Sequence, residues 1–156
     1  MAEFTGREPT EGWLTQEIAL SQADGVFVEA GAYNGEELSN SLFFEKERGW
    51  SGLLIEPDPW NYYALRKRNR NARSIQCCLS KELLGQTIDF KQSDTMGRVV
   101  TPEEKKSLPG IYTKVKCFPL GLVLIAAGIR RVDLLSLDIE GRELEVLSHF
   151  PFDENL

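Results

Sequence analysis

Short, mostly apolar runs that alternate with helical segments are the feature that most limits the fold of this chain. Three of these runs lie at residues 26–28, 53–55 and 132–137. A strand that is apolar along its whole length is typical of a parallel sheet covered by helices on both faces. The pattern therefore predicts an α/β fold, a doubly wound sheet with right-handed crossovers, whose ligands bind at the carboxyl ends of the strands.

The remaining elements are placed by apolar spacing and by the residues that begin or end helices. Gly49 and Gly128 are typical of helix ends, and Pro59 suits the first turn of a helix. The sequence predicts helices at about residues 13–24, 36–48, 59–71, 119–127 and 140–150, and further strands at residues 74–79, 87–90 and 115–118. The polar stretch at residues 91–110 is expected to be a loop or an excursion from the sheet.

The charge balance argues against one class of partner. The 156 residues carry a net charge of −6, whereas proteins that bind nucleic acids usually have a basic surplus that contacts phosphates. The one basic cluster, residues 66–68 with Arg70 and Arg73, is interpreted as a solvated helix face. We therefore expect no nucleic-acid partner.

Neither a membrane span nor a secretory segment is apparent in the sequence. No run approaches the roughly 18 apolar residues of a membrane span, and residues 1–12 are polar and acidic, unlike a signal peptide. These features predict a cytoplasmic chain without a membrane span.

The three cysteines, Cys77, Cys78 and Cys117, lie in or beside apolar runs. Their number is odd and two of them are adjacent, so we interpret them as small, buried and reduced side chains. They lack the spacing of metal ligands, and the only histidine, His149, has no partner motif nearby. No metal site is therefore expected.

A glycine-bearing turn follows the first predicted strand, with the sequence EAGAYNG at residues 29–35. Its G-x-x-x-G spacing differs from the G-x-G-x-x-G of dinucleotide-binding proteins, which argues against a pyrophosphate ligand. Glycines allow the backbone to approach a ligand closely, and Glu29 suits a ligand that carries an ammonium group. A tight strand-to-helix turn without a ligand is the alternative interpretation. Tyr33 is one of several aromatic residues near the strand ends that could stack on a base.

Two further strand ends carry acids. Glu56 follows the strand at residues 53–55, where a carboxylate can bind both hydroxyls of a ribose. A helix-capping role is the alternative for Glu56, but Asp58 is the better candidate for the cap. Asp138 closes the strand at residues 132–137 and is expected to face the cleft, while the nearby Glu140 and Glu143 suit the first turn of a helix.

These three strand ends resemble one known family in the same order along the chain. The strings FVEAGAYNG (27–35), LIEPDP (54–59) and VDLLSLDIEG (132–141) resemble the motifs of the FkbM-type methyltransferases. Two further strings, SNSLFFEKERGW (39–50) and KCFPL (116–120), resemble the animal subgroup related to the Star protein.

The resemblance implies a Rossmann-like class I methyltransferase sheet at residues 26–156, preceded by a polar segment and helix at residues 1–25. It also implies S-adenosylmethionine as cofactor and O-methylation of a small molecule or sugar. In this interpretation Glu29 holds the methionine amino group and Glu56 holds the ribose. Asp138 lies nearest the methyl transfer. Three further residues are assigned to the cofactor site: Gly31, Tyr33 and Gly35.

A non-catalytic module of the Star-like kind is the main alternative, with a role in ER-to-Golgi or endosomal membrane trafficking of a signalling precursor. In that case, if the chain is N-terminally truncated, it would be located in the ER, the Golgi or endosomes. The absence of a histidine near the cleft motifs favours it, because an obvious general base is missing. The first motif and Glu56 instead favour cofactor binding. An NAD-dependent oxidoreductase is disfavoured by the glycine spacing.

The sequence also predicts a sheet that is incomplete at its C-terminal side. The full family fold has seven strands, and residues 151–156 are too few and too polar to supply a neighbour for the strand at residues 132–137. An apolar edge strand is prone to aggregation. We therefore expect a partial form of the domain, or a protein partner that covers this edge.

Overall fold

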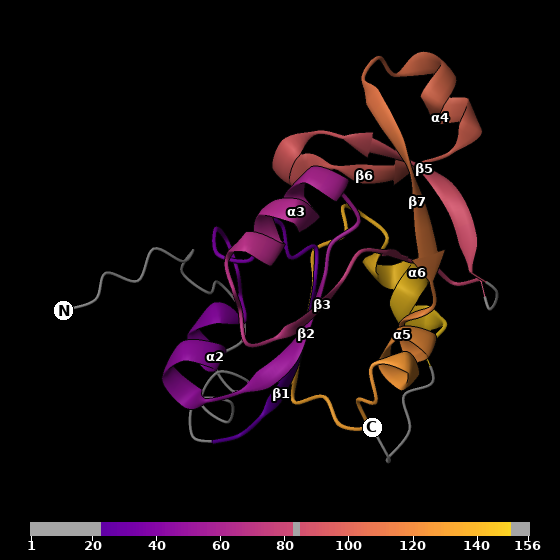
Figure 1. The fold of residues 1–156 in the computed structure, drawn as a ribbon. Helices are drawn as coiled ribbons and strands as arrows, with labels where there is room; N and C mark the ends of the chain where they lie inside the picture. Colours follow the sequence, from indigo (N-terminus) through magenta and orange to yellow (C-terminus); the bar gives the residue numbers. More distant parts are fainter. Residues whose placement is uncertain (1–22, 83–84, 151–156) are drawn as a thin grey trace.

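The structure is a computed structural model that describes residues 23–82 and 85–150 (Figure 1). The helix predicted at about residues 13–24 and most of the predicted segment 1–25 lie outside the described residues. The elements in chain order are β1 (Val26–Ala30), α2 (Leu42–Arg48), β2 (Ser51–Ile55), α3 (Pro59–Lys67), β3 (Arg73–Ile75), β4 (Cys78–Leu79), β5 (Gln86–Gln92), η1 (Asp94–Met96), β6 (Arg98–Val100), α4 (Pro102–Ser107), β7 (Ile111–Phe118), α5 (Leu120–Ala126), β8 (Leu134–Leu137) and α6 (Glu143–Ser148).

Four parallel strands form the first sheet in the order β3-β2-β1-β8. In the register of this sheet, Val28 of β1 lies opposite Leu53 of β2 and Leu135 of β8. The prediction of a mixed α/β fold with a parallel sheet is confirmed. Because the strands are parallel, β1, β2 and β8 all end at one edge of the sheet, and their carboxyl ends carry the predicted acids.

Helices cover both faces of this sheet, which explains why β1, β2 and β8 are mostly apolar. Phe27 and Leu54 pack with Leu65 on one face, where Figure 1 shows α2 and α3. Side chains of the opposite parity, including Val28 and Ile55, pack on the other face, where α5 and α6 lie. Removing an aliphatic or aromatic side chain of this size from water contributes about 1.5–3 kcal/mol, so alternate residues of each strand stabilise two separate layers.

A second, mixed sheet lies beyond the carboxyl ends of the first, in the order β4-β7-β5-β6 (Figure 1). The peripheral strand predicted at residues 87–90 is present as β5, but the loop predicted at residues 91–110 is wrong in part, because it contains β6 and α4. Both are short: β6 has three residues, and α4 begins with a capping box between Thr101 and Glu104. Elements of this length leave almost no periodic signal in a sequence.

The strand predicted at residues 74–79 is divided between the two sheets, because β3 pairs with β2 and β4 pairs with β7. This division places Cys78 directly opposite Cys117, and the two form a disulfide. The prediction that all three cysteines are reduced is therefore wrong for this pair. The adjacency of Cys77 and Cys78 concealed it, since only Cys78 faces β7, whereas Cys77 is a free, buried thiol.

Several predicted helices are shorter in the structure. The helix predicted at residues 36–48 begins only at Leu42, because Oδ1 of Asn34 accepts the backbone N–H groups of Glu36 and Glu37 and holds the chain in a turn. Leu38, predicted on the apolar face of that helix, has a φ of 60° and is exposed. The helices predicted at residues 59–71, 119–127 and 140–150 are shortened to α3, α5 and α6, and the strand predicted at residues 132–137 is shortened to β8.

Within the described residues, β8 pairs only with β1, so its outer edge faces no other strand of the sheet. In the same part of the chain, no helix has the length and apolar character needed to cross a membrane.

Candidate functional site

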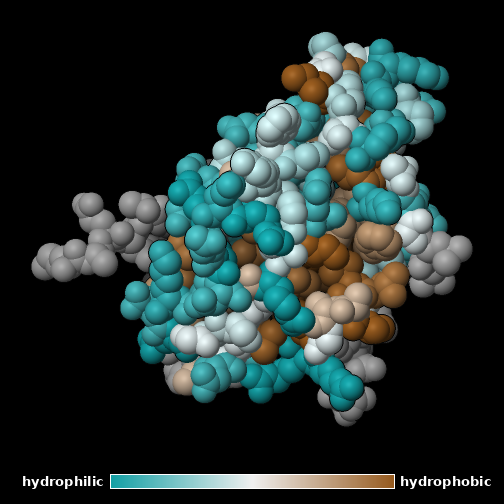
Figure 2. All heavy atoms as spheres, viewed as in Figure 1, coloured by the Kyte–Doolittle hydropathy of each residue, from teal (hydrophilic) through white to brown (hydrophobic). Residues whose placement is uncertain are grey.

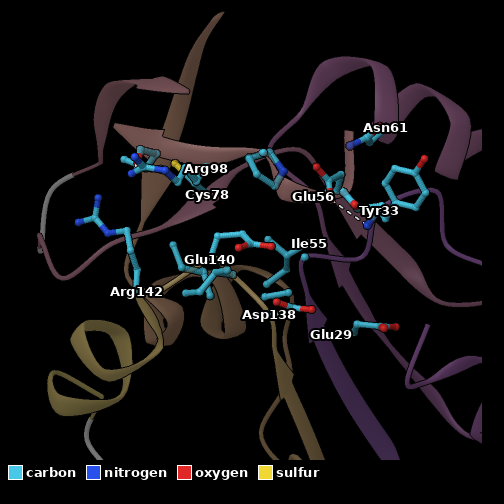
Figure 3. Close-up of a pocket in the computed structure, with 18 of the residues that line it drawn as sticks. Glu29, Tyr33, Ile55, Glu56, Asn61, Cys78, Arg98, Asp138, Glu140 and Arg142 are labelled. Carbon is cyan, nitrogen blue, oxygen red and sulfur yellow. Dashed lines mark hydrogen bonds between the residues drawn. The ribbon is translucent and has the colours of Figure 1, made fainter. Parts of the chain in front are cut away.

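A cavity lies where β1, β2 and β8 end, and residues of the second sheet form its opposite wall (Figure 3). Five of the six predicted site residues line it: Glu29, Gly31, Tyr33, Glu56 and Asp138. Gly35 does not line the cavity. A Cβ atom at Gly35 would lie 3.2 Å from Cγ of Leu65 on α3, so this glycine shapes the end of the turn next to α3.

Glu56 is held at the centre of the site by two backbone groups. Its Oε2 accepts a hydrogen bond of 2.8 Å from the N–H of Tyr33, and its Oε1 accepts one of 2.8 Å from the N–H of Asp58. The side chain is buried, and this burial raises the pKa of Glu56 to about 7. The carboxyl group is therefore fixed in orientation and close to its titration point at neutral pH.

Asp58 caps the following helix, as the sequence predicts. Its Oδ1 accepts the N–H groups of Trp60 at 2.8 Å and Asn61 at 3.2 Å, and Pro59 occupies the first turn. Because Asp58 satisfies these helix donors, Glu56 is not needed as the cap and is left for the cavity.

Tyr33 joins the first sheet to the second. Its backbone has a φ of 47°, a region that few non-glycine residues adopt. Its hydroxyl donates a hydrogen bond of 2.7 Å to Oδ1 of Asp94 in η1, and this bond raises the pKa of Tyr33 to about 12. Asn61 donates to the carbonyl oxygen of Asp94 at 3.2 Å, and Gln92 donates to Oδ2 of Asp58 at 3.1 Å.

Three of these residues, Asn61, Gln92 and Asp94, were not predicted as part of the site. Asp94 and Gln92 lie in the stretch that was assigned to a loop or its border, and no local pattern marks either of them. The sequence could not reveal them, because their partners lie more than 30 residues away in the chain.

Glu29 is buried and turned toward the segment that precedes α2. Its Oε1 accepts the N–H of Asn40 at 2.7 Å, and its Oε2 accepts the hydroxyl groups of Ser39, at 2.8 Å, and Ser41. All of these donors are neutral, so no cation of the described residues contacts the Glu29 carboxylate directly.

Arg70 also stabilises the segment that precedes α2. Its Nε forms an ion pair of 2.9 Å with Oε2 of Glu45, and the two side chains are only 3% and 5% exposed. The guanidinium also donates to the hydroxyl groups of Ser39 and Ser41 and to the carbonyl oxygen of Gly35. The interpretation of the basic cluster as a solvated face is therefore wrong for Arg70, because its guanidinium is buried and paired with Glu45.

Gly31 sits where β1 and β8 end side by side. It has a φ of 84°, and a Cβ atom at this position would overlap the backbone carbonyl oxygen of Asp138. The close approach at Gly31 is therefore one between the ends of β1 and β8 of this chain. The sequence predicts instead a close approach of the backbone to a ligand.

Two acids after β8, Asp138 and Glu140, line the middle of the cavity between the other labelled residues of Figure 3. Among the described residues, no hydrogen bond or ion pair reaches either carboxylate. Glu140 has a φ of 56°, a left-handed conformation that few non-glycine residues adopt. Glu143 instead accepts the N–H groups of Ile139 and Gly141 and stabilises the turn itself.

The charges of the cavity are strongly unbalanced. Its described lining residues include two guanidinium groups, those of Arg98 and Arg142. The carboxylates that line it are six: Glu29, Glu37, Glu56, Asp94, Asp138 and Glu140. Among the described residues, no three His, Cys, Asp or Glu side chains are placed so that they could hold a metal ion together. The part of the cavity around Glu29 and Glu56 is therefore suited to a ligand group with positive charge rather than to a phosphate.

Comparison with known proteins identifies the family of the chain. No curated protein and no solved structure matches the chain. The sequence model of one family, described as Methyltransferase FkbM domain, matches residues 29–155. This range contains all three strand ends of the cavity and the whole second sheet, and it covers most of the chain. The chain therefore belongs to the FkbM methyltransferase family.

Proposed function

We propose that this chain is an S-adenosylmethionine-dependent methyltransferase with a Rossmann-like class I sheet, acting on an oxygen atom of a small molecule or sugar. The observation that carries the proposal is the position of Glu56, a buried acid that faces the cavity directly after β2 and is hydrogen-bonded to the turn after β1. Membership of the FkbM family implies this cofactor in general.

The residues of the cavity fit S-adenosylmethionine in charge. The cofactor carries a sulfonium, an ammonium and a carboxylate group, so it has a net positive charge, and it carries no phosphate. Six carboxylates against two guanidinium groups line the cavity. A dinucleotide would instead bring a pyrophosphate next to Glu29 and Glu56, where like charges repel. The turn after β1 also lacks the glycine spacing that a pyrophosphate needs.

Each residue has a role that its contacts allow. Glu56 would hold the ribose hydroxyls, since each of its oxygens accepts one backbone hydrogen bond and can accept another. Glu29 would hold the ammonium group, because its present donors are all neutral and a buried carboxylate favours a cation. Gly31 and Gly35 would maintain the turn, and Tyr33 would form its wall.

For this reaction the protein must align the acceptor with the methyl group and remove the proton of the acceptor hydroxyl. When bound, S-adenosylmethionine supplies the electrophilic methyl group. The acceptor hydroxyl must lose its proton, and the carboxylate of Asp138, which no described side chain engages, can accept it. The carboxylate of Asp138 could thus act as the general base in place of a histidine, which is absent near the strand ends.

One observation favours a second role in protein binding, as in a non-catalytic Star-like module. Apolar residues reach the surface over α5 and α6 in Figure 2. Ile125 of α5 and Leu144 of α6 are 76% and 80% exposed. Together with the outer edge of β8, this surface would suit a protein partner, and such a role is compatible with cofactor binding.

Calorimetric titration tests the proposal. The chain should bind S-adenosylmethionine and its product S-adenosylhomocysteine, and NAD should not bind. Transfer of a radiolabelled methyl group to a pool of small-molecule hydroxyl compounds then separates an enzyme from a cofactor-binding module. Binding of NAD in place of S-adenosylmethionine would contradict the proposal.

A further inference from the structure

The two guanidinium groups of the cavity lie at one end of it. Arg98 lies in β6 of the second sheet, and Arg142 directly precedes α6. Figure 3 shows both side chains at the end of the cavity opposite Glu29 and Tyr33, with Glu140 and Asp138 between the two ends. The cavity therefore has an acidic end, an acidic middle and a basic end.

Each of these arginines is held in place by an acid of the same region. Nη1 of Arg98 forms an ion pair of 2.8 Å with Oε1 of Glu104, and Nη2 of Arg142 forms one of 2.7 Å with Oε1 of Glu145. Nε of Arg142 also donates to Glu145 at 3.1 Å. These pairs favour one direction of each side chain before a ligand arrives, which lowers the entropy that binding must remove.

Donors remain on both groups after these pairs are formed. A guanidinium has five N–H donors. Nε and Nη2 of Arg98 and Nη1 of Arg142 have no hydrogen-bond partner among the described residues. Two pre-oriented guanidinium groups with spare donors are the arrangement by which proteins recognise a carboxylate or a phosphate.

We propose that the methyl acceptor carries an anionic oxygen group, a carboxylate or a phosphate, which Arg98 and Arg142 bind. This inference rests on the proposed methyltransferase function and deepens it by giving the class of the acceptor. The charge pattern also fixes the direction of binding, because the anion is repelled from the acidic end that the cofactor would occupy. The acceptor hydroxyl is then left in the middle of the cavity, where Asp138 and Glu140 lie.

The test uses the full chain saturated with S-adenosylhomocysteine and two probes, inorganic phosphate and acetate. Binding is followed by the NMR signals of the arginine Nε–H groups at constant ionic strength. At least one probe should bind, and Arg98→Gln or Arg142→Gln should weaken it roughly tenfold, as expected for a hydrogen bond to a charged group. Phosphate alone would assign a phosphorylated acceptor, and acetate alone a carboxylate.

Arg68→Gln is the matched control, since Arg68 has a similar exposure to Arg98 and a similar ion pair, with Glu36, but lies outside the cavity. This control and both cavity variants should keep the affinity for S-adenosylhomocysteine. Absence of probe binding, or equal binding by wild type and both cavity variants, would overturn the inference. If S-adenosylhomocysteine itself fails to bind, the proposed function fails, and the same titration without it still tests the anion site.

Discussion

The backbone N–H of Tyr33 donates a hydrogen bond of 2.8 Å to Oε2 of Glu56. This bond joins the turn after β1 to the acid after β2, so the two motifs form one structural unit. The hydroxyl of the same tyrosine reaches Asp94 of the second sheet. A change at Glu56 is therefore expected to affect the turn, the cavity and the docking of the second sheet together.

The pKa of Glu56 leads to a prediction about pH. Since burial raises this pKa to about 7, the carboxyl group is mostly neutral below that value and mostly charged above it. Affinity for the cationic cofactor should therefore rise as pH increases from 6 to 8. The rise should disappear in Glu56→Gln and persist in His149→Gln, the control for the only imidazole in the chain. A pH-independent affinity in the wild type would contradict the prediction.

The same shift has the opposite effect on stability. The folded state binds the Glu56 proton more tightly than the unfolded chain, whose group titrates near 4.5. The contribution of Glu56 to the free energy of unfolding should thus decrease as pH rises from 4.5 to about 7 and then level off. Urea denaturation of the wild type and Glu56→Gln across this range measures the difference. If the difference in the free energy of unfolding between the two proteins does not change with pH, the pKa of Glu56 is not raised.

The bond between Tyr33 and Asp94 should couple the two sheets energetically. Tyr33→Phe and Asp94→Ala should each lower the free energy of unfolding by about 0.5–1.5 kcal/mol, and the double variant should lose no more than either single one. Tyr63→Phe is the control, since Tyr63 is exposed. Additive effects in the double-mutant cycle would mean that the hydrogen bond does not form in solution.

Two glycines with similar backbone angles should respond differently to alanine. Gly31 and Gly141 have φ values of 84° and 94°, but a Cβ atom meets nothing within 4 Å at Gly141 and overlaps the Asp138 carbonyl oxygen at Gly31. Gly141→Ala should cost about 1 kcal/mol of backbone strain. Gly31→Ala should cost about 1–3 kcal/mol more, because the ends of β1 and β8 must separate. Equal losses in thermal denaturation would contradict the close approach.

Two ion pairs allow a test of the buried network. Arg70→Met leaves the buried Glu45 without its cation and should lower the free energy of unfolding by about 3–5 kcal/mol. Arg68→Met breaks a pair whose side chains are both about two-fifths exposed, and it should cost about 1 kcal/mol or less. Similar midpoints of urea denaturation for both variants would mean that Arg70 is solvated after all.

The features that the sequence predicted are those that depend on neighbouring residues. The strands of the first sheet, the acids at their ends and the cap at Asp58 follow from runs, spacing and turn residues within a few positions. The second sheet, the Arg70–Glu45 pair and the Cys78–Cys117 disulfide depend on pairings between distant segments. Such pairings leave no local pattern, so the residues that complete the site from the second sheet became visible only in the structure.

The central claim is that Glu56 holds the cofactor, and the most direct measurement compares cofactor affinities by calorimetry. S-adenosylmethionine should bind the wild type, and Glu56→Ala should weaken binding roughly tenfold or more, as expected when a hydrogen bond to a charged group is lost. Glu103→Ala, which removes an exposed acid of α4 outside the cavity, should bind like the wild type. Circular dichroism checks that each variant is folded. Wild-type affinity in a folded Glu56→Ala variant, or no binding of S-adenosylmethionine by the wild type, would contradict this account.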